Sequence, residues 1–166
     1  LADFTDKVVI NVDFEKGSKL ASNDIYFFYP ELVQNKIYDF STKAHGNLNN
    51  FLAKNLFLSD GNMIVNGDLH FKNITVVEER GFTISGNITE LKTSNKSLKE
   101  LLPNILENKL PSQLDNLGNV LMTGQIRLTR NDLDLKSNIV TQIGNLTTDL
   151  KMQNITDSDN TSYQGD

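Results

Sequence analysis

Apolar and polar residues alternate about a repeated glycine, and this alternation constrains the fold more than any other feature. Around Gly67, residues of one parity are apolar and those of the other are polar; the apolar ones are Met63, Val65, Leu69 and Phe71. Successive side chains point to opposite faces of a strand, so the pattern predicts a strand with one apolar face. Four more segments repeat it, with apolar residues at Val8, Ile10, Val12 and Phe14; at Phe82, Ile84 and Ile88; at Val120, Met122, Ile126 and Leu128; and at Leu146, Leu150 and Met152.

The glycine belongs to a recurring word of Gly, a polar residue, and Leu or Ile. The word occurs at Gly46, Gly67, Gly86, Gly124 and Gly144, with spacings of 21, 19, 38 and 20 residues. A glycine in the middle of a strand permits a sharp bend, so its repetition predicts a sheet that curls along a line. A period of about 20 residues holds two strands of about 6–8 residues with turns, or one coil of a β-solenoid. The alternative is that Gly-Asn pairs mark turns in an asparagine-rich chain.

One helical segment is expected between residues 94 and 117. Ser97-Leu98-Lys99-Glu100 matches a capping box, which marks a helix N-terminus. The apolar residues that follow have helical spacing and define one face: Leu98, Leu101, Leu102, Ile105 and Leu106. Pro103 lies within this run and predicts a kink or a restart. We expect the segment to pack over the apolar side of the sheet, or alternatively to lie in a groove as a lid.

Composition and motifs argue against several classes of function. The net charge of −5 provides no basic stripe for phosphates, so no nucleic-acid partner is expected. The chain has no cysteine, which excludes disulfides and thiol nucleophiles. His45 and His70 have no partners at metal-ligand spacing, so we expect no metal and no cofactor. No catalytic motif is present, and the sequence therefore predicts a protein that is not an enzyme.

Several words, in this order, resemble the TamB-like and AsmA-like family of the Bacteroidota type. Residues 39–58 are similar to its "small-G-x-L-x-x-L … L-x-L" word, and residues 66–74 to "G-x-L-x-F-x-x-I". Leu98-Lys99-Glu100-Leu101-Leu102-Pro103 resembles the "L-K-x-L-L-P" segment, and residues 141–150 resemble "T-x-L-G-x-L-x-x-D-L". Tyr163-Gln164-Gly165 resembles the opening of the following repeat, so we expect a segment of a longer protein. The resemblance covers roughly residues 39 to 166.

The resemblance implies a mainly β fold: an elongated, curved antiparallel sheet folded lengthwise into a groove, with one short amphipathic helical segment. Residues 39–93 are then repeated one-sided strands, 94–117 the helical segment, and 118–166 further strands of the same domain. Residues 1–38, which the resemblance does not cover, are expected to be leading strands of the groove. The implied location is the periplasm, within a protein anchored in the inner membrane. The implied partners are phospholipid acyl chains and an outer-membrane β-barrel of the assembly-factor type.

The function that follows is to shield acyl chains in a hydrophobic groove. The groove would serve lipid transport between the inner and outer membranes, outer-membrane protein assembly, or both. Its lining is predicted from the shared parity about the glycines to be Met63, Val65, Leu69, Phe71, Phe82, Ile84, Ile88, Met122, Ile126, Leu128, Leu146, Leu150 and Met152. The alternative is a sealed β-solenoid or sandwich that acts as a structural, adhesion or protein-binding module, with the same residues in a closed core.

Overall fold

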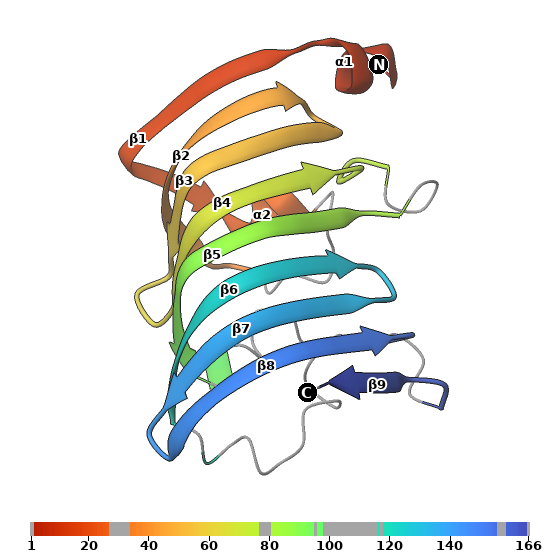
Figure 1. Ribbon diagram of the computed structural model, residues 1–166. Coiled ribbons are helices and arrows are strands. Elements are labelled where there is room, and N and C mark those ends of the chain that lie inside the picture. Colours follow the sequence, from red (N-terminus) through yellow and green to blue (C-terminus); the bar gives the residue numbers. More distant parts are fainter. Residues whose placement is uncertain are drawn as a thin grey trace.

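The computed structural model describes residues 2–26, 34–76, 81–94, 96–97, 116, 118–155 and 159–165. Nine strands form one antiparallel sheet in chain order, so each strand pairs with the next (Figure 1). The strands are β1 (Ile10–Ala21), β2 (Ile37–Asn47), β3 (Asn50–Ser59), β4 (Ile64–Lys72), β5 (Thr83–Ser94), β6 (Asn119–Thr129), β7 (Leu133–Thr141), β8 (Gly144–Gln153) and β9 (Ser162–Gly165). Within the described residues, β1 and β9 are the two edges, and the sheet does not close on itself. The predicted mainly β fold is confirmed.

The strands are longer than the predicted 6–8 residues. β1 to β8 have 9 to 12 residues each, and Figure 1 shows them bending together so that the sheet curves around one side. Neighbouring strands are antiparallel and consecutive, whereas the coils of a β-solenoid stack in parallel. The described strands therefore form a meander of hairpins, and the solenoid coil is not the unit of this fold.

The spacing of about 20 residues between glycines is not a structural repeat. The step from Gly46 in β2 to Gly67 in β4 spans two strands, but the next step, to Gly86 in β5, spans one. Because the loops differ in length, glycines that are equally spaced in the sequence are separated by different numbers of strands in the sheet. The expectation of a mid-strand glycine holds for Gly67, Gly86 and Gly124. It is wrong for Gly46 and Gly144, which lie near the end of β2 and at the start of β8.

A line of register shifts crosses the sheet where the strands bend, and we call this line the crease. In the β1–β2 ladder, residues 15–17 face a single residue of β2. β3 has one extra residue against both of its neighbours at Asn55, and β5 has one extra at Thr89–Glu90. The β6–β7, β7–β8 and β8–β9 ladders have no register shift. Bulges bend a strand and increase its twist, so three bulged strands in alternation contribute to the bend of β1 to β5.

Two short helices lie near the N-terminus and were not predicted. They are α1 (Ala2–Lys7) and α2 (Ser22–Tyr26), both too short to be detected by hydrophobic periodicity. Most of the helical segment predicted for residues 94–117 lies outside the described residues, including Leu98, Leu101, Leu102, Ile105 and Leu106. At its start, Ser94 ends β5, while Lys96 and Ser97 are helical. None of the described helices has the length and apolar character needed to cross a membrane.

Candidate functional site

The apolar residues of the strands form continuous rows along one face of the sheet, which we call the inner face. One row is set by direct pairing of Leu69 with Gly86, Gly86 with Ile126, Ile126 with Leu135, and Leu135 with Leu150. Opposed residues of antiparallel strands project to the same face, so the row runs from β4 to β8. A parallel row contains Phe71, Ile84, Leu128, Leu133 and Met152.

The structure places the predicted lining residues on this inner face or beside it. A third row joins Met122, Ile139 and Leu146 on the other side of the crease, and Val65 pairs with Leu91 there. We call the side with Leu69 and Ile126 wall A, and the side with Met122 and Leu146 wall B. Met63 and Phe82 immediately precede β4 and β5, and both are buried.

The middle of the inner face is packed against protein. Leu69, Ile88 and Met122 form one buried cluster, and half-buried side chains from both walls pack against it; these are Leu56, Phe71, Ile84, Leu91, Ile126, Leu135 and Ile139. A second cluster joins Phe82, Leu128 and Ile155 at the end of wall A. Burial of apolar surface is worth roughly 25 cal/mol per Å², so both clusters stabilise the fold.

Exposure of the inner face rises towards the last long strand. Ile88 in β5 is 6% exposed, whereas Leu146 in β8 is 57% exposed. Leu150 and Met152 of the same strand are half-buried. At the opposite edge, Phe14 of β1 is also exposed. The apolar rows are therefore closed in the middle of the sheet and accessible at its two ends.

Sequence reasoning missed several residues of the inner face. Phe51, Ala53, Leu56 and Leu58 of β3 share it, but the bulge at Asn55 switches parity between Ala53 and Leu56 and hides the alternation. The same happens in β5 between Ile88 and Leu91. In β7 the signal was present, because Leu133, Leu135 and Ile139 share one parity, with Ser137 as the polar residue among them.

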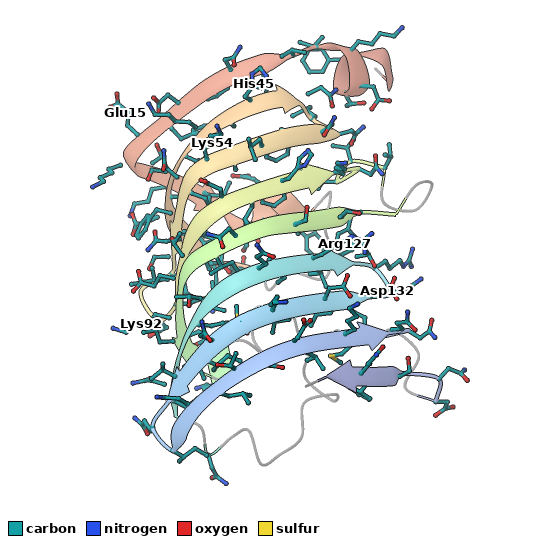
Figure 2. The ribbon with its side chains drawn as sticks, in the orientation of Figure 1. Glu15, His45, Lys54, Lys92, Arg127 and Asp132 are labelled. Atoms are coloured by element: carbon teal, nitrogen blue, oxygen red, sulfur yellow. The ribbon has the colours of Figure 1, made fainter. Side chains whose placement is uncertain are left out.

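The outer face is polar and has cross-strand ion pairs. Lys43 lies 3.3 Å from Asp13, Arg127 3.6 Å from Asp134, and Lys136 3.1 Å from Asp149. Figure 2 shows side chains such as His45, Lys54 and Arg127 on this side of the ribbon. These pairs are exposed, and each contributes about 1 kcal/mol or less. The charged side chains of these pairs stay in contact with water, on the face opposite the apolar rows.

Both histidines are bound to asparagine side chains. Nδ1 of His45 lies 2.5 Å from Oδ1 of Asn11, and Nε2 of His70 lies 2.6 Å from Oδ1 of Asn50. An amide oxygen accepts, so each ring nitrogen donates its hydrogen. Partial burial and, secondarily, Lys72 lower the pKa of His70 below its usual value. Both rings lie in polar strand-to-strand contacts on the outer face.

Asn49 connects three segments at the end of wall A. It is 4% exposed, and its Nδ2 donates to Oδ1 of Asp6 at 2.9 Å. Its Oδ1 accepts from the backbone nitrogen of Thr75 at 3.1 Å and from the Thr75 hydroxyl at 2.5 Å. The β2–β3 turn is thereby attached both to α1 and to the segment after β4.

Asp60 connects the turns at the end of wall B. Its Oδ2 accepts from Lys36 Nζ at 3.0 Å, and its Oδ1 accepts from the backbone nitrogens of Asn62 and Met63. Burial alone would raise the pKa of Asp60. The hydrogen bonds from Lys36, Met63 and Asn62 and the charge of Lys36 together outweigh burial, so the pKa of Asp60 lies below its usual value. On the nearby inner side, burial raises the pKa of the Tyr38 hydroxyl.

The chemistry available to this arrangement is apolar contact along the inner face and hydration along the outer face. Comparison of the chain with protein-family models, with curated proteins and with solved structures found no match.

Proposed function

We propose that this chain is a segment of a periplasmic bridge that shields lipid acyl chains along the inner face of its sheet. The observation that carries the proposal is the exposure of Leu146 at the end of rows that continue through β4 to β8. Burying one such side chain is worth roughly 1.5–3 kcal/mol, which favours an apolar occupant over water.

An acyl chain suits this surface because the inner rows provide contact without polar recognition. Each CH₂ transferred from water contributes about 0.8 kcal/mol, so several methylenes along the exposed end of the rows suffice for weak, reversible binding. Transport between membranes, the inner-membrane anchor and the outer-membrane barrel partner belong to the proposal through the resemblance to TamB-like sequences.

The free edge of β8 supports protein binding as a second candidate. β9 pairs with Leu150, Lys151, Met152 and Gln153, so among the described strands the edge of β8 from Gly144 to Asp149 has no partner strand. An extended segment of another protein can add to such an edge through backbone hydrogen bonds. Outer-membrane protein assembly would use this edge, whereas acyl shielding would use the inner face.

Native mass spectrometry of the purified chain tests the proposal. We expect adducts of phospholipid mass after incubation with vesicles of phosphatidylethanolamine and phosphatidylglycerol, and fewer adducts for Leu146→Asp. Arg127→Ala, on the outer face, is the matched control and should keep the adducts. Absence of adducts from the unaltered, folded chain would favour the sealed structural module.

A further inference from the structure

We infer that the crease is a hinge, about which walls A and B splay apart in β1 to β5 while β6 to β8 stay fixed. The inference deepens the proposed function, on which its purpose rests: opening would expose the buried middle of the inner face to an acyl chain. The motion itself is a property of the sheet and can be measured without lipid.

The register shifts are confined to one part of the sheet. All five ladders from β1–β2 to β5–β6 are interrupted, and the three that follow are regular. Each interruption removes regular ladder hydrogen bonds where the strand bends, so resistance to further bending is lowest there. Because the interruptions lie in adjacent strands along one line, they permit a rotation that a single bulge would not.

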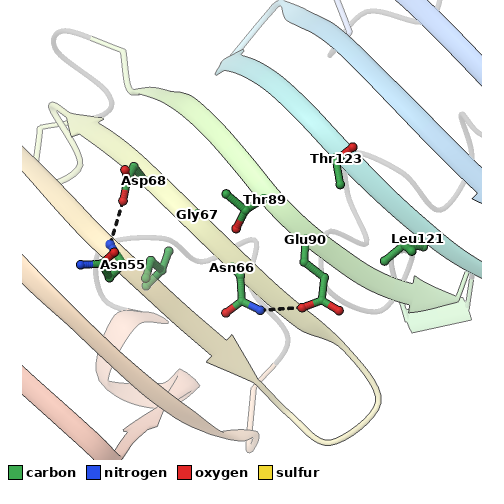
Figure 3. A pocket seen from close by; sticks show the side chains of 9 residues that line it. Asn55, Asn66, Gly67, Asp68, Thr89, Glu90, Leu121 and Thr123 are labelled. Atoms are coloured by element: carbon green, nitrogen blue, oxygen red, sulfur yellow. Dashed lines mark hydrogen bonds between the residues drawn. The ribbon is translucent and has the colours of Figure 1, made fainter.

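Polar side chains bridge the strands on the outer side of the crease. The backbone nitrogen of Asn55, a bulge residue with φ of 51°, donates to Oδ1 of Asp68 at 2.7 Å. One ladder further, Asn66 Nδ2 donates to Oε2 of Glu90 at 2.7 Å (Figure 3). Both bonds join neighbouring strands at the bulges: the Asn55–Asp68 bond is exposed, and the Asn66–Glu90 bond is part-buried. Water can take the place of a carboxylate wherever it reaches such a bond.

A pocket of about 590 Å³ lies along the same line on the outer side. It is lined by residues from β3 to β6, both polar, such as Asn55, Asp68 and Glu90, and apolar, namely Leu56 and Leu121 (Figure 3). When two walls splay, their outer sides approach each other at the bend. A well-packed outer side would resist this movement, whereas an open pocket leaves room for it.

The middle of the inner face is what such a movement would uncover. Leu69 lies on wall A, Met122 on wall B, and Ile88 between them at the crease, and all three belong to one buried cluster. Leu146, beyond the regular β6–β7 ladder, is exposed without any movement. An acyl chain could thus reach the β8 end of the inner face at any time, and the middle of the inner face only when the hinge is open.

Pulsed electron paramagnetic resonance between two spin labels tests the hinge in the absence of lipid. The chain has no cysteine, so Lys72→Cys with Lys92→Cys labels walls A and B across the bulged β4–β5 region. Arg127→Cys with Val140→Cys labels the same two walls across the regular β6–β7 ladder and is the matched control. All four positions are exposed. We expect a broad or bimodal distance distribution for the first pair and a narrow one for the second.

A second variant separates a hinge from general disorder. Adding Glu90→Ala to the first pair removes the hydrogen bond from Asn66 and should shift the population towards the longer label-to-label distance, whereas Glu90→Gln should restore most of the original distribution. Equally narrow distributions, or equal broadening of both label pairs, would overturn the hinge. A broad first pair in a chain that binds no phospholipid would retain the hinge and overturn the proposed function.

Discussion

Gly67 in β4 lies opposite Ile88 in β5, and the space between the two strands has no room for a side chain on Gly67. A Cβ there would overlap the carbonyl oxygen of Asn87 and lie 3.1 Å from Cα of Ile88. The glycine is therefore required by the close approach of two backbones at the crease.

Replacing Gly67 with alanine should lower the free energy of unfolding by about 1–3 kcal/mol, since a backbone must shift to admit the methyl group. Gly165→Ala is the control, because the nearest atom to its added Cβ is 3.4 Å away, which is ordinary contact. Denaturant titration of both variants gives the comparison. Equal stability of the two variants would show that the strands do not approach so closely at Gly67.

Asn49→Ala should destabilise the chain by about 1–3 kcal/mol, because it removes the hydrogen bonds that the buried Asn49 side chain makes with the half-buried Asp6 and Thr75. Asn87→Ala, at an exposed position of β5, should change stability by about 0.5 kcal/mol or less. Urea unfolding followed by circular dichroism measures both. If the Asn49→Ala chain were as stable as the control, the hydrogen bonds of Asn49 would not stabilise the end of wall A.

Asp60 should make stability depend on pH in the acidic range. The pKa of this carboxyl is lowered in the fold, so its contribution is complete above the unfolded pKa of about 3.9 and is lost as the pH falls through the folded pKa. The stability difference between the unaltered chain and Asp60→Asn should therefore be constant at neutral pH and shrink as the pH falls below about 4. Unfolding midpoints at several pH values test this, and a constant difference would contradict it.

Much of the sheet could be predicted from alternation, and the failures have physical causes. β4 and β6 keep one parity from end to end, so the inner positions Leu69, Met122 and Ile126 follow directly from the sequence. Bulges depend on how a strand meets its neighbours, and nothing in the sequence around Asn55 or Thr89 marks the extra residue. Ile88 is buried and Leu146 is exposed because Ile88 lies in the middle of the sheet and Leu146 near its end. The alternation pattern does not distinguish these two positions.

Charges placed on the inner face should have opposite consequences at its middle and at its end. Ile88→Asp puts a carboxylate in the buried cluster and should cost about 3 kcal/mol or more, enough to unfold a marginal domain. Leu146→Asp leaves the carboxylate in water and should cost about 1 kcal/mol or less, while weakening lipid binding. Thermal unfolding measures both variants. Unfolding of Leu146→Asp would mean that the β8 end is a sealed core.

Photo-crosslinking at two neighbouring residues of β8 tests the central claim most directly. Leu146 projects to the inner face and Asn145 to the outer face, and both are exposed, so a photoreactive amino acid at either site is accessible from solution. After incubation with phospholipid vesicles and irradiation, mass spectrometry counts the lipid attached at each position. The account predicts lipid attached at position 146 and little at position 145. Equal attachment at both positions, or none at 146 in a folded chain, would contradict it.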